Sequence, residues 1–201
     1  MGQNHARVYQ EISNLVGVAD PNSEQGKEVA DRFGVQWFSN YKDLIPLVDS
    51  VSISTPTIHH YSIAKDFLEY KKNILVEKPF TINVEESIEL IKISEKNNLV
   101  LAVGHIERHN PVVNFLKNKV LNNESGELIS LSSKRFSPYP ERISDVGIIF
   151  DLSVHDIDVF NYIFNKYPIS VYTIGGNYTG KNKEEHVLIT LDYGGGNFGF
   201  C

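Results

Sequence analysis

Short apolar runs alternate with amphipathic stretches over the first 125 residues of the chain. The amphipathic stretches have the periodicity of helices, and they cover residues 4–13, 24–33, 57–71, 84–97 and 111–122. The runs between them are apolar throughout, and they cover residues 15–19, 50–54, 73–77 and 99–104. Strands that are buried on both faces have this pattern, as in a parallel sheet covered by helices. The alternation therefore predicts a doubly wound α/β domain.

The pattern changes after the polar stretch "NNESGE" at 122–127. The segments that follow predict a strand, an apolar helix and two further strands, at 127–136, 149–164, 169–178 and 186–194. A Pro-rich loop separates the first strand from the helix, and the run "GNFGFC" predicts one more strand at the end of the sequence. We therefore predict a second domain, of the α+β class with an open antiparallel sheet, over residues 124–201, after a first domain over residues 1–123.

Charge and composition narrow the class of protein. The 25 acidic and 19 basic residues give a net charge of −6, and no cluster of Lys and Arg could follow a nucleic-acid backbone. We therefore expect no nucleic-acid partner. No apolar run reaches the roughly 20 residues that span a bilayer, and no signal peptide is visible. Cys201 is the single cysteine, so a disulfide framework is excluded and a cytoplasmic location is the expectation.

The opening residues have the pattern of a phosphate-binding turn. Gly2 precedes a predicted helix, and Asp20 ends the next apolar run, 18 residues later. In a dinucleotide-binding unit the glycine admits the pyrophosphate at the helix N-terminus, and the acidic residue binds the ribose hydroxyls. Such a turn normally follows a strand, and no strand-like run precedes Gly2 in this sequence. The alternative is a glycine before an ordinary helix and an aspartate in a turn.

Two further polar groups follow predicted strands. Thr55 and Pro56 end one apolar run, and Thr57 could cap the next helix. Glu77 and Lys78 end the following run, where a partly desolvated lysine could exchange a proton with a substrate hydroxyl. The alternatives are an ordinary strand-to-helix turn and a solvated pair of charges.

The predicted helix at 149–164 carries Asp151, His155 and Asp158 on one face. An imidazole beside carboxylates suits acid/base chemistry, although a buried structural histidine has the same pattern. His105 and His109 have the i, i+4 spacing of a zinc pair, but Pro111 indicates that the helix begins after them. No cysteine lies near them, so we predict no metal site.

Together these stretches resemble one family. "GQNHAR", "VADP", "STPTIHHY", "NILVEKPF", "VGHIERHNP" and "DVGIIFDLSVHDID" occur in the order found in the Gfo/Idh/MocA oxidoreductases. The resemblance implies a Rossmann-like first domain that binds NAD, or less favourably NADP, and a second domain that binds substrate and forms oligomers. It implies hydride transfer between the nicotinamide and a hydroxyl carbon of a sugar. The "HIER" stretch is most similar to the branch that oxidises UDP-N-acetylglucosamine at its 3-position.

The resemblance also implies roles for individual residues. The catalytic positions are matched by Lys78, Asp151 and His155. The cofactor-side positions are matched by Gly2, Asp20, Thr55, Pro56, His59 and Glu77. The substrate positions are matched by His105, Glu107, Arg108 and Asn110. We expect the catalytic residues to meet in one cleft between the domains, and the whole protein to be a homo-oligomer through its C-terminal sheet. The alternatives are a dehydrogenase of a free sugar or of a polyol such as inositol, and a non-catalytic NAD-binding regulator.

The sequence departs from the family pattern at its two ends. Only the last of the family's three glycines, Gly2, is present, and members of the family are longer than 300 residues. We therefore expect this chain to be part of a longer protein, without the first strand of the Rossmann-like domain. Because that strand normally lies in the middle of the sheet, a gap is predicted between the runs at 15–19 and 50–54.

Overall fold

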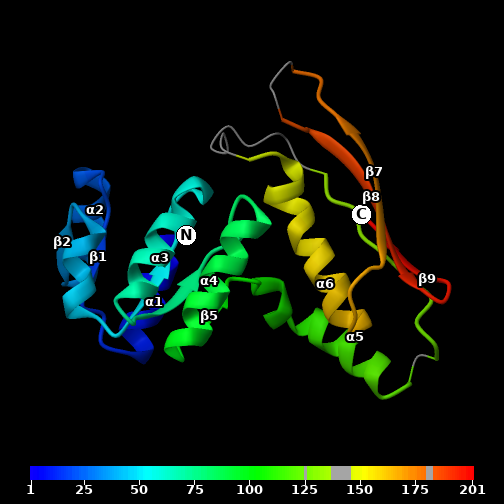
Figure 1. Cartoon of the computed structure of the whole chain (residues 1–201), viewed down its shortest axis with the longest axis horizontal. Helices are drawn as coiled ribbons and strands as arrows, with labels where there is room; N and C mark the ends of the chain where they lie inside the picture. Colours follow the sequence, from blue (N-terminus) through cyan, green and yellow to red (C-terminus); the bar gives the residue numbers. More distant parts are fainter. Residues whose placement is uncertain (125, 137–145, 180–182) are drawn as a thin grey trace. The chain divides into compact units, whose positions relative to one another are not determined.

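The computed structural model describes residues 1–124, 126–136, 146–179 and 183–201. The chain forms two compact units, Met1–Gly104 and His105–Cys201 (Figure 1). Most of the predicted Pro-rich loop lies outside the described residues. In the described part of the chain, no helix has both the length and the apolar character needed to cross a membrane.

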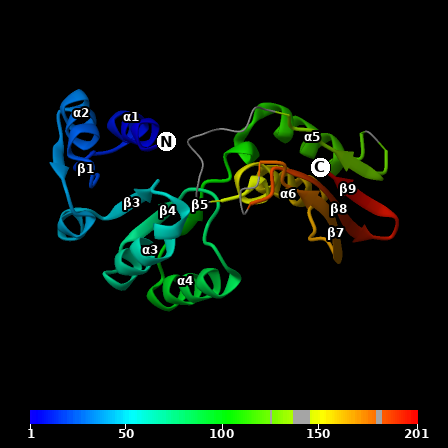
Figure 2. The same ribbon diagram turned by 90° about the horizontal axis from the view of Figure 1, so that it is seen from above.

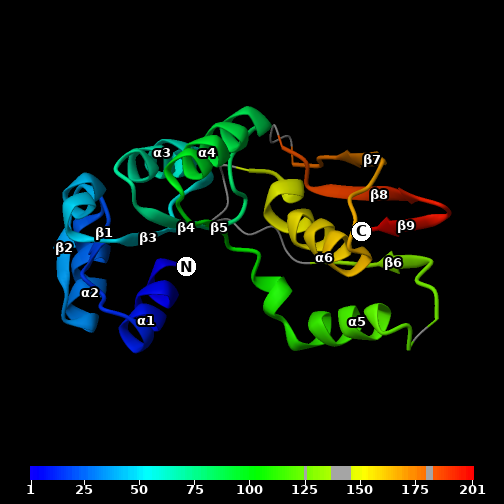
Figure 3. The ribbon, with the colours of Figure 1, turned by 60° about the horizontal axis from the view of Figure 1, so that its bottom comes forward.

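All four apolar runs of the first unit form strands, as predicted. β3 (Ser50–Ile53), β4 (Asn73–Val76) and β5 (Leu101–Val103) form one parallel sheet. β1 (Gly17–Ala19) pairs in parallel with β2 (Gln36–Phe38), a short strand that the pattern did not predict. Among the described strands, β1 pairs with β2 alone and β3 with β4 alone, so the predicted gap between β1 and β3 is confirmed. The five strands of this unit are labelled in Figure 3.

Helices cover both faces of these strands. α1 (Gly2–Ile12) and α2 (Ser23–Phe33) lie on one face, and α3 (His60–Glu69) and α4 (Val84–Asn97) lie on the other (Figure 2). Side chains of Asn22 and Asn83 accept hydrogen bonds from the free N–H groups at the starts of α2 and α4, which fixes where these helices begin. The core between α3, α4 and the sheet is apolar, with Phe67, Leu68, Ile74, Val76 and Leu90 all buried.

Short 3-10 turns lie where the pattern predicted loops or longer helices. They are η1 (Tyr41–Leu47), η2 (Thr57–His59) and η3 (Ile106–His109). The helix predicted at 57–71 therefore begins with the tighter turn η2 and becomes α-helical at His60. Pro56 precedes η2, and a proline donates no hydrogen bond at such a boundary.

The second unit packs helices on one face of a four-stranded sheet with the order β6-β9-β8-β7. The strands are β6 (Ser130–Ser132), β7 (Ser170–Gly176), β8 (His186–Gly194) and β9 (Asn197–Phe200). β7, β8 and β9 are antiparallel, as predicted, but β6 is parallel to β9, so the sheet is mixed. The connection from β6 to β9 contains the helix and two strands, which is long enough for a parallel crossover.

A π-helical turn, η4 (Ile149–Ser153), continues directly into α6 (Val154–Phe164). Phe160 of α6 packs on Ile189, Leu191 and Tyr193 of β8, which form the core of this unit. α5 (Pro111–Leu121) packs against α6, so its contacts place it in the second unit, whereas the sequence analysis placed it in the first domain.

The outward face of the sheet is apolar and exposed, with Tyr172, Ile174, Leu188 and Phe198 each at least 40% exposed. Residues that face each other across antiparallel strands share a face, and Ile174 is opposite Leu188. This is the sheet through which oligomer formation was predicted, and that assembly stays a prediction.

Candidate functional site

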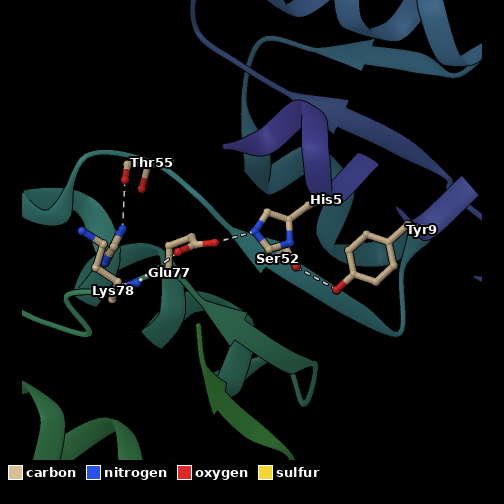
Figure 4. Close-up of polar contacts among 7 residues, drawn as sticks. His5, Tyr9, Ser52, Thr55, Glu77 and Lys78 are labelled. Atoms are coloured by element: carbon tan, nitrogen blue, oxygen red, sulfur yellow. Dashed lines mark hydrogen bonds and ion pairs between the residues drawn. The ribbon is translucent and has the colours of Figure 1, made fainter. Parts of the chain in front are cut away.

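The carboxyl ends of β3 and β4 bring Thr55, Glu77 and Lys78 to one edge of the parallel sheet (Figure 4). The ladder between these strands continues beyond their ends, because the Glu77 N–H donates to the Ile53 carbonyl at 2.9 Å. Ligands bind at this edge in open α/β sheets. The structure therefore brings Thr55 close to the predicted catalytic lysine, which is half-buried.

Glu77 is held by groups from three parts of the unit. Its Oε1 lies 2.7 Å from Nε2 of His5 on α1, and its Oε2 accepts the backbone N–H of Lys78 at 3.3 Å (Figure 4). Gly104, after β5, faces the same carboxylate, and a Cβ at that position would lie 3.0 Å from Oε2. The hydrogen bond from His5 lowers the pKa of Glu77 and outweighs the effect of burial, so the carboxylate stays ionised at neutral pH.

His60 joins the loops that follow β3 and β4. Its side chain is buried, with Nε2 at 2.9 Å from the Thr55 carbonyl oxygen and Nδ1 at 2.8 Å from that of Pro79. The neighbouring His59, which the resemblance assigned to the cofactor side, is exposed on η2. Sequence spacing alone gave no signal that His60 rather than His59 contacts both loops.

Three features of the first unit fit a dinucleotide. The N-cap of α1 is Met1, which gives no side-chain hydrogen bond to the first turn, so backbone donors remain for an anion. Asp20 follows β1, and its Oδ1 accepts the Asn22 N–H at 2.8 Å, which orients the carboxylate. Oγ1 of Thr55 is buried and has no hydrogen-bond partner among the described residues. A buried hydroxyl without a partner is costly, and a ligand at this edge would satisfy it.

The remaining predicted catalytic residues lie on one helical run of the second unit. Asp151 is in η4 and His155 is in the first turn of α6, and both are half-buried. Single-turn π-helical segments inside helices are frequent at functional sites. Because Lys78 belongs to the other unit, its predicted convergence with Asp151 and His155 stays a prediction.

Two buried carboxylates of α6 are paired with arginines. Asp158 receives two hydrogen bonds from Arg108, at 2.8 Å from Nε and 2.5 Å from Nη2. Asp156 receives one from Nε of Arg135 at 2.8 Å. The contact with Asp158 raises the pKa of Arg108, which keeps this pair ionised. The Arg108 contact holds the stretch that was assigned to substrate against α6, and the Arg135 contact holds the segment after β6 against the same helix.

The other predicted substrate residues lie around the same stretch. Nδ1 of His105 lies 3.5 Å from Asp158, and burial lowers the pKa of His105. Oδ1 of Asn110 accepts the Val112 N–H and so caps α5, while its Nδ2 donates to Glu107 at 3.1 Å. Among the described residues, no group of three or more His, Cys, Asp or Glu side chains could hold a metal ion.

Comparisons with known proteins show two family models in succession along the chain. Residues 1–105 match the oxidoreductase family with an NAD-binding Rossmann fold, and residues 114–201 match the GFO/IDH/MocA C-terminal domain. UDP-N-acetylglucosamine 3-dehydrogenase of Acidithiobacillus ferrooxidans is 35% identical over 175 residues, which cover 87% of this chain and 55% of that protein. The NAD(+) scyllo-inositol 2-dehydrogenase of Bacillus subtilis is 30% identical over 166 residues, 79% of this chain and 48% of that protein.

The fold is shared with solved structures as well. The structure of the Acidithiobacillus ferrooxidans UDP-N-acetylglucosamine 3-dehydrogenase superposes with a TM-score of 0.89 at 32% identity, covering 99% of this chain and 64% of that one. The chain spans about half the length of the curated relatives it matches. Since consecutive parts of the sequence match the N-terminal and C-terminal models of one family, we conclude that the chain belongs to the Gfo/Idh/MocA oxidoreductases.

Proposed function

We propose that the whole protein is an NAD-dependent dehydrogenase that oxidises a hydroxyl carbon of a nucleotide sugar, with UDP-N-acetylglucosamine and its 3-position as the first candidate. The observation that carries the proposal is the placement of Lys78 after β4, beside an ionised Glu77 and the unpartnered hydroxyl of Thr55. The similarity to the Acidithiobacillus enzyme supports the choice of substrate.

In this proposal Lys78 and His155 exchange the proton of the substrate hydroxyl, and Asp151 orients the pair. Bound NAD supplies the acceptor for the hydride that leaves the same carbon. Positioning and proton transfer each contribute orders of magnitude to such a rate. The first turn of α1, Asp20 and Thr55 would hold the cofactor, with the α1 backbone N–H groups facing the pyrophosphate.

The test is NADH formation, followed by absorbance, when the full-length protein is mixed with NAD and UDP-N-acetylglucosamine. Lys78→Met should lower kcat by about 10²- to 10⁴-fold, as expected when a proton-transferring group is lost. Lys92→Met, which changes an exposed lysine of α4, is the matched control and should leave kcat unchanged. Turnover of scyllo-inositol in place of the nucleotide sugar would favour the polyol alternative, which the Bacillus relative supports. Binding of NAD without turnover of any sugar would favour a non-catalytic regulator.

We also propose that the protein prefers NAD to NADP. Asp20 would accept hydrogen bonds from both ribose hydroxyls, and its negative charge would repel a 2′-phosphate. Asp20→Ala should weaken NAD binding and reduce the preference for NAD over NADP. Titration calorimetry of the full-length protein with both cofactors measures this. Equal or tighter binding of NADP by the unmutated protein would contradict the assignment.

A further inference from the structure

Glu77 connects the first helix of the chain to the residue beside it, Lys78. The His5 contact crosses 72 residues of sequence, and the side chains of His5 and Glu77 are only 21% and 14% exposed. His5 lies one turn from the start of α1, and Glu77 directly precedes Lys78 after β4. The pair therefore links α1, whose start we propose to bind the pyrophosphate, to the main chain of the predicted catalytic lysine (Figure 4).

The two oxygens of the carboxylate have separate tasks. Oε1 faces the imidazole of His5, and Oε2 accepts the N–H of Lys78. Gly104 leaves the space that Oε2 occupies, since a Cβ there would approach this oxygen to 3.0 Å. The orientation that the imidazole imposes on Oε1 therefore also sets the position of Oε2, because both oxygens belong to one rigid planar group.

We propose that His5 is a positioning residue: it orients the Glu77 carboxylate, which in turn holds the main chain of Lys78 in place for proton transfer. The assignment of a reaction to Lys78 rests on the proposed function. The effect of His5 on the position of the Lys78 main chain does not depend on the proposed function, and it can be measured without substrate.

The physical argument concerns a half-buried negative charge. Hydrogen bonds to a charged acceptor are about twice as strong as those between neutral groups. Without His5 the carboxylate would lose its partner on Oε1 and turn toward water, and the Lys78 N–H would lose its acceptor. Displacement of a reacting group by about 1 Å can lower a rate by about 100-fold.

α1 offers a matched control on the same face of the helix. Tyr9 lies one turn after His5, and its hydroxyl shares a 2.7 Å hydrogen bond with Ser52 Oγ of β3 (Figure 4). Tyr9→Phe removes this second polar contact between α1 and the parallel sheet without changing Glu77. A general loosening of α1 would change the environment of Lys78 both when His5 is replaced and in Tyr9→Phe. A positioning role of His5 predicts a change only when His5 is replaced.

The experiment compares His5→Ala, His5→Gln and Tyr9→Phe in the full-length protein. The first measurement is amide hydrogen exchange at Lys78 by NMR, without cofactor or substrate. We expect exchange to be about 3- to 10-fold faster in His5→Ala and unchanged in Tyr9→Phe. The glutamine variant keeps an N–H donor near the position of Nε2 and should restore slow exchange. Unchanged exchange in His5→Ala, or the same acceleration in Tyr9→Phe, would overturn the proposal.

The second measurement is steady-state kinetics on the same variants. His5→Ala should lower kcat by about 10- to 100-fold while the KM for NAD changes by less than about 3-fold, and His5→Gln should recover most of kcat. An increase in the KM for NAD with unchanged kcat would instead make His5 a cofactor contact and overturn the positioning role. If the unmutated protein turns over no sugar, the proposed function fails, while the exchange measurement still decides whether His5 holds the Lys78 main chain.

Discussion

Two buried or half-buried carboxylates in this protein are held by hydrogen bonds from residues that are distant in the sequence. Glu77 depends on His5, and Asp158 depends on Arg108, 50 residues before it. Both carboxylates are largely removed from water, with exposed side-chain fractions of 14% and 9%. The loss of one partner leaves the other in a site where water replaces it only in part, so these contacts are sensitive to substitution.

The pKa of Glu77 predicts how stability depends on pH. The hydrogen bond from His5 lowers this pKa below its ordinary value of 4.5 in the folded protein. The contribution of Glu77 to stability is therefore fully present above about pH 4.5 and is lost as the pH falls through the folded pKa. Urea unfolding between pH 7 and pH 3 should show a free-energy difference between the unmutated protein and Glu77→Gln that shrinks below pH 4.5. A difference independent of pH would contradict this expectation.

The pair between Arg108 and Asp158 should contribute more than an exposed ion pair. Asp158→Asn should lower the free energy of unfolding by about 1–3 kcal/mol, because a bidentate charged contact with a buried carboxylate is lost. Glu28→Gln is the control, since Glu28 pairs with Arg32 at 2.9 Å on the exposed face of α2. That variant should cost no more than about 0.5 kcal/mol. Urea denaturation of both variants measures their free energies of unfolding. Equal losses of stability would show that burial does not strengthen the Arg108–Asp158 pair.

The sequence pattern suggested candidate site residues, but it did not show which contacts hold their side chains in place. Thr55, Glu77 and Lys78 were predicted as site residues because they follow apolar strands, and the structure places them at one edge of the parallel sheet. Their roles stay a prediction. His5 and His60 were missed, because their contacts depend on the packing of α1 and α3 and leave no periodic signal. Asn110 was assigned to substrate, and the structure shows it capping α5.

At the scale of elements, α2 and the β1-β2 pair depend on one close approach. A Cβ at Gly26 would lie 2.3 Å from Nε1 of Trp37 and 3.0 Å from Cβ of Asp20. The same Nε1 donates to the Asp20 carbonyl at 3.0 Å, so the indole joins β2 to the loop after β1. The placement of Asp20 therefore depends on the absence of a side chain at Gly26 of α2.

Gly26→Ala should therefore displace Trp37 and lower stability by about 1–3 kcal/mol, as overpacking does. Trp37 is the single tryptophan, so its fluorescence reports the change directly. If Asp20 binds the ribose as we propose, NAD affinity should fall as well, because the Trp37 indole donates a hydrogen bond to the Asp20 carbonyl. Gly34→Asn is the control, because no atom lies within 4 Å and asparagine tolerates the left-handed backbone at φ +66°. Unchanged fluorescence in Gly26→Ala would show that α2 can shift to accommodate the methyl group.

Regular elements were predictable where their periodic pattern is long. The predicted helices at 84–97 and 111–122 agree with α4 and α5 to within one residue. β2 has three residues, as β1 and β5 do, but it includes the polar Gln36 and lies in no continuous apolar run, so the pattern did not show it. The parallel pairing of β6 with β9 could not be predicted either, because β6 is distant in sequence from its partner.

At the scale of the whole molecule, the alternation of apolar runs and helices predicted the fold class, and both family models agree with it. The gap between β1 and β3 was predicted from the strand order of Rossmann-like sheets, in which a further strand lies between these two. The boundary between the two compact units was harder to predict from the sequence than the fold class. The change of pattern lies at 122–127, yet α5 packs on α6, and the units divide after Gly104.

The buried ring of His60 has a mechanical consequence. One imidazole touches a carbonyl from each of the two loops that carry Thr55 and Lys78. Close-packed interiors transmit displacement instead of absorbing it. A displacement of the Thr55 loop is therefore transmitted through the His60 ring to the Lys78 loop. We expect the two strand ends to move together as a rigid unit.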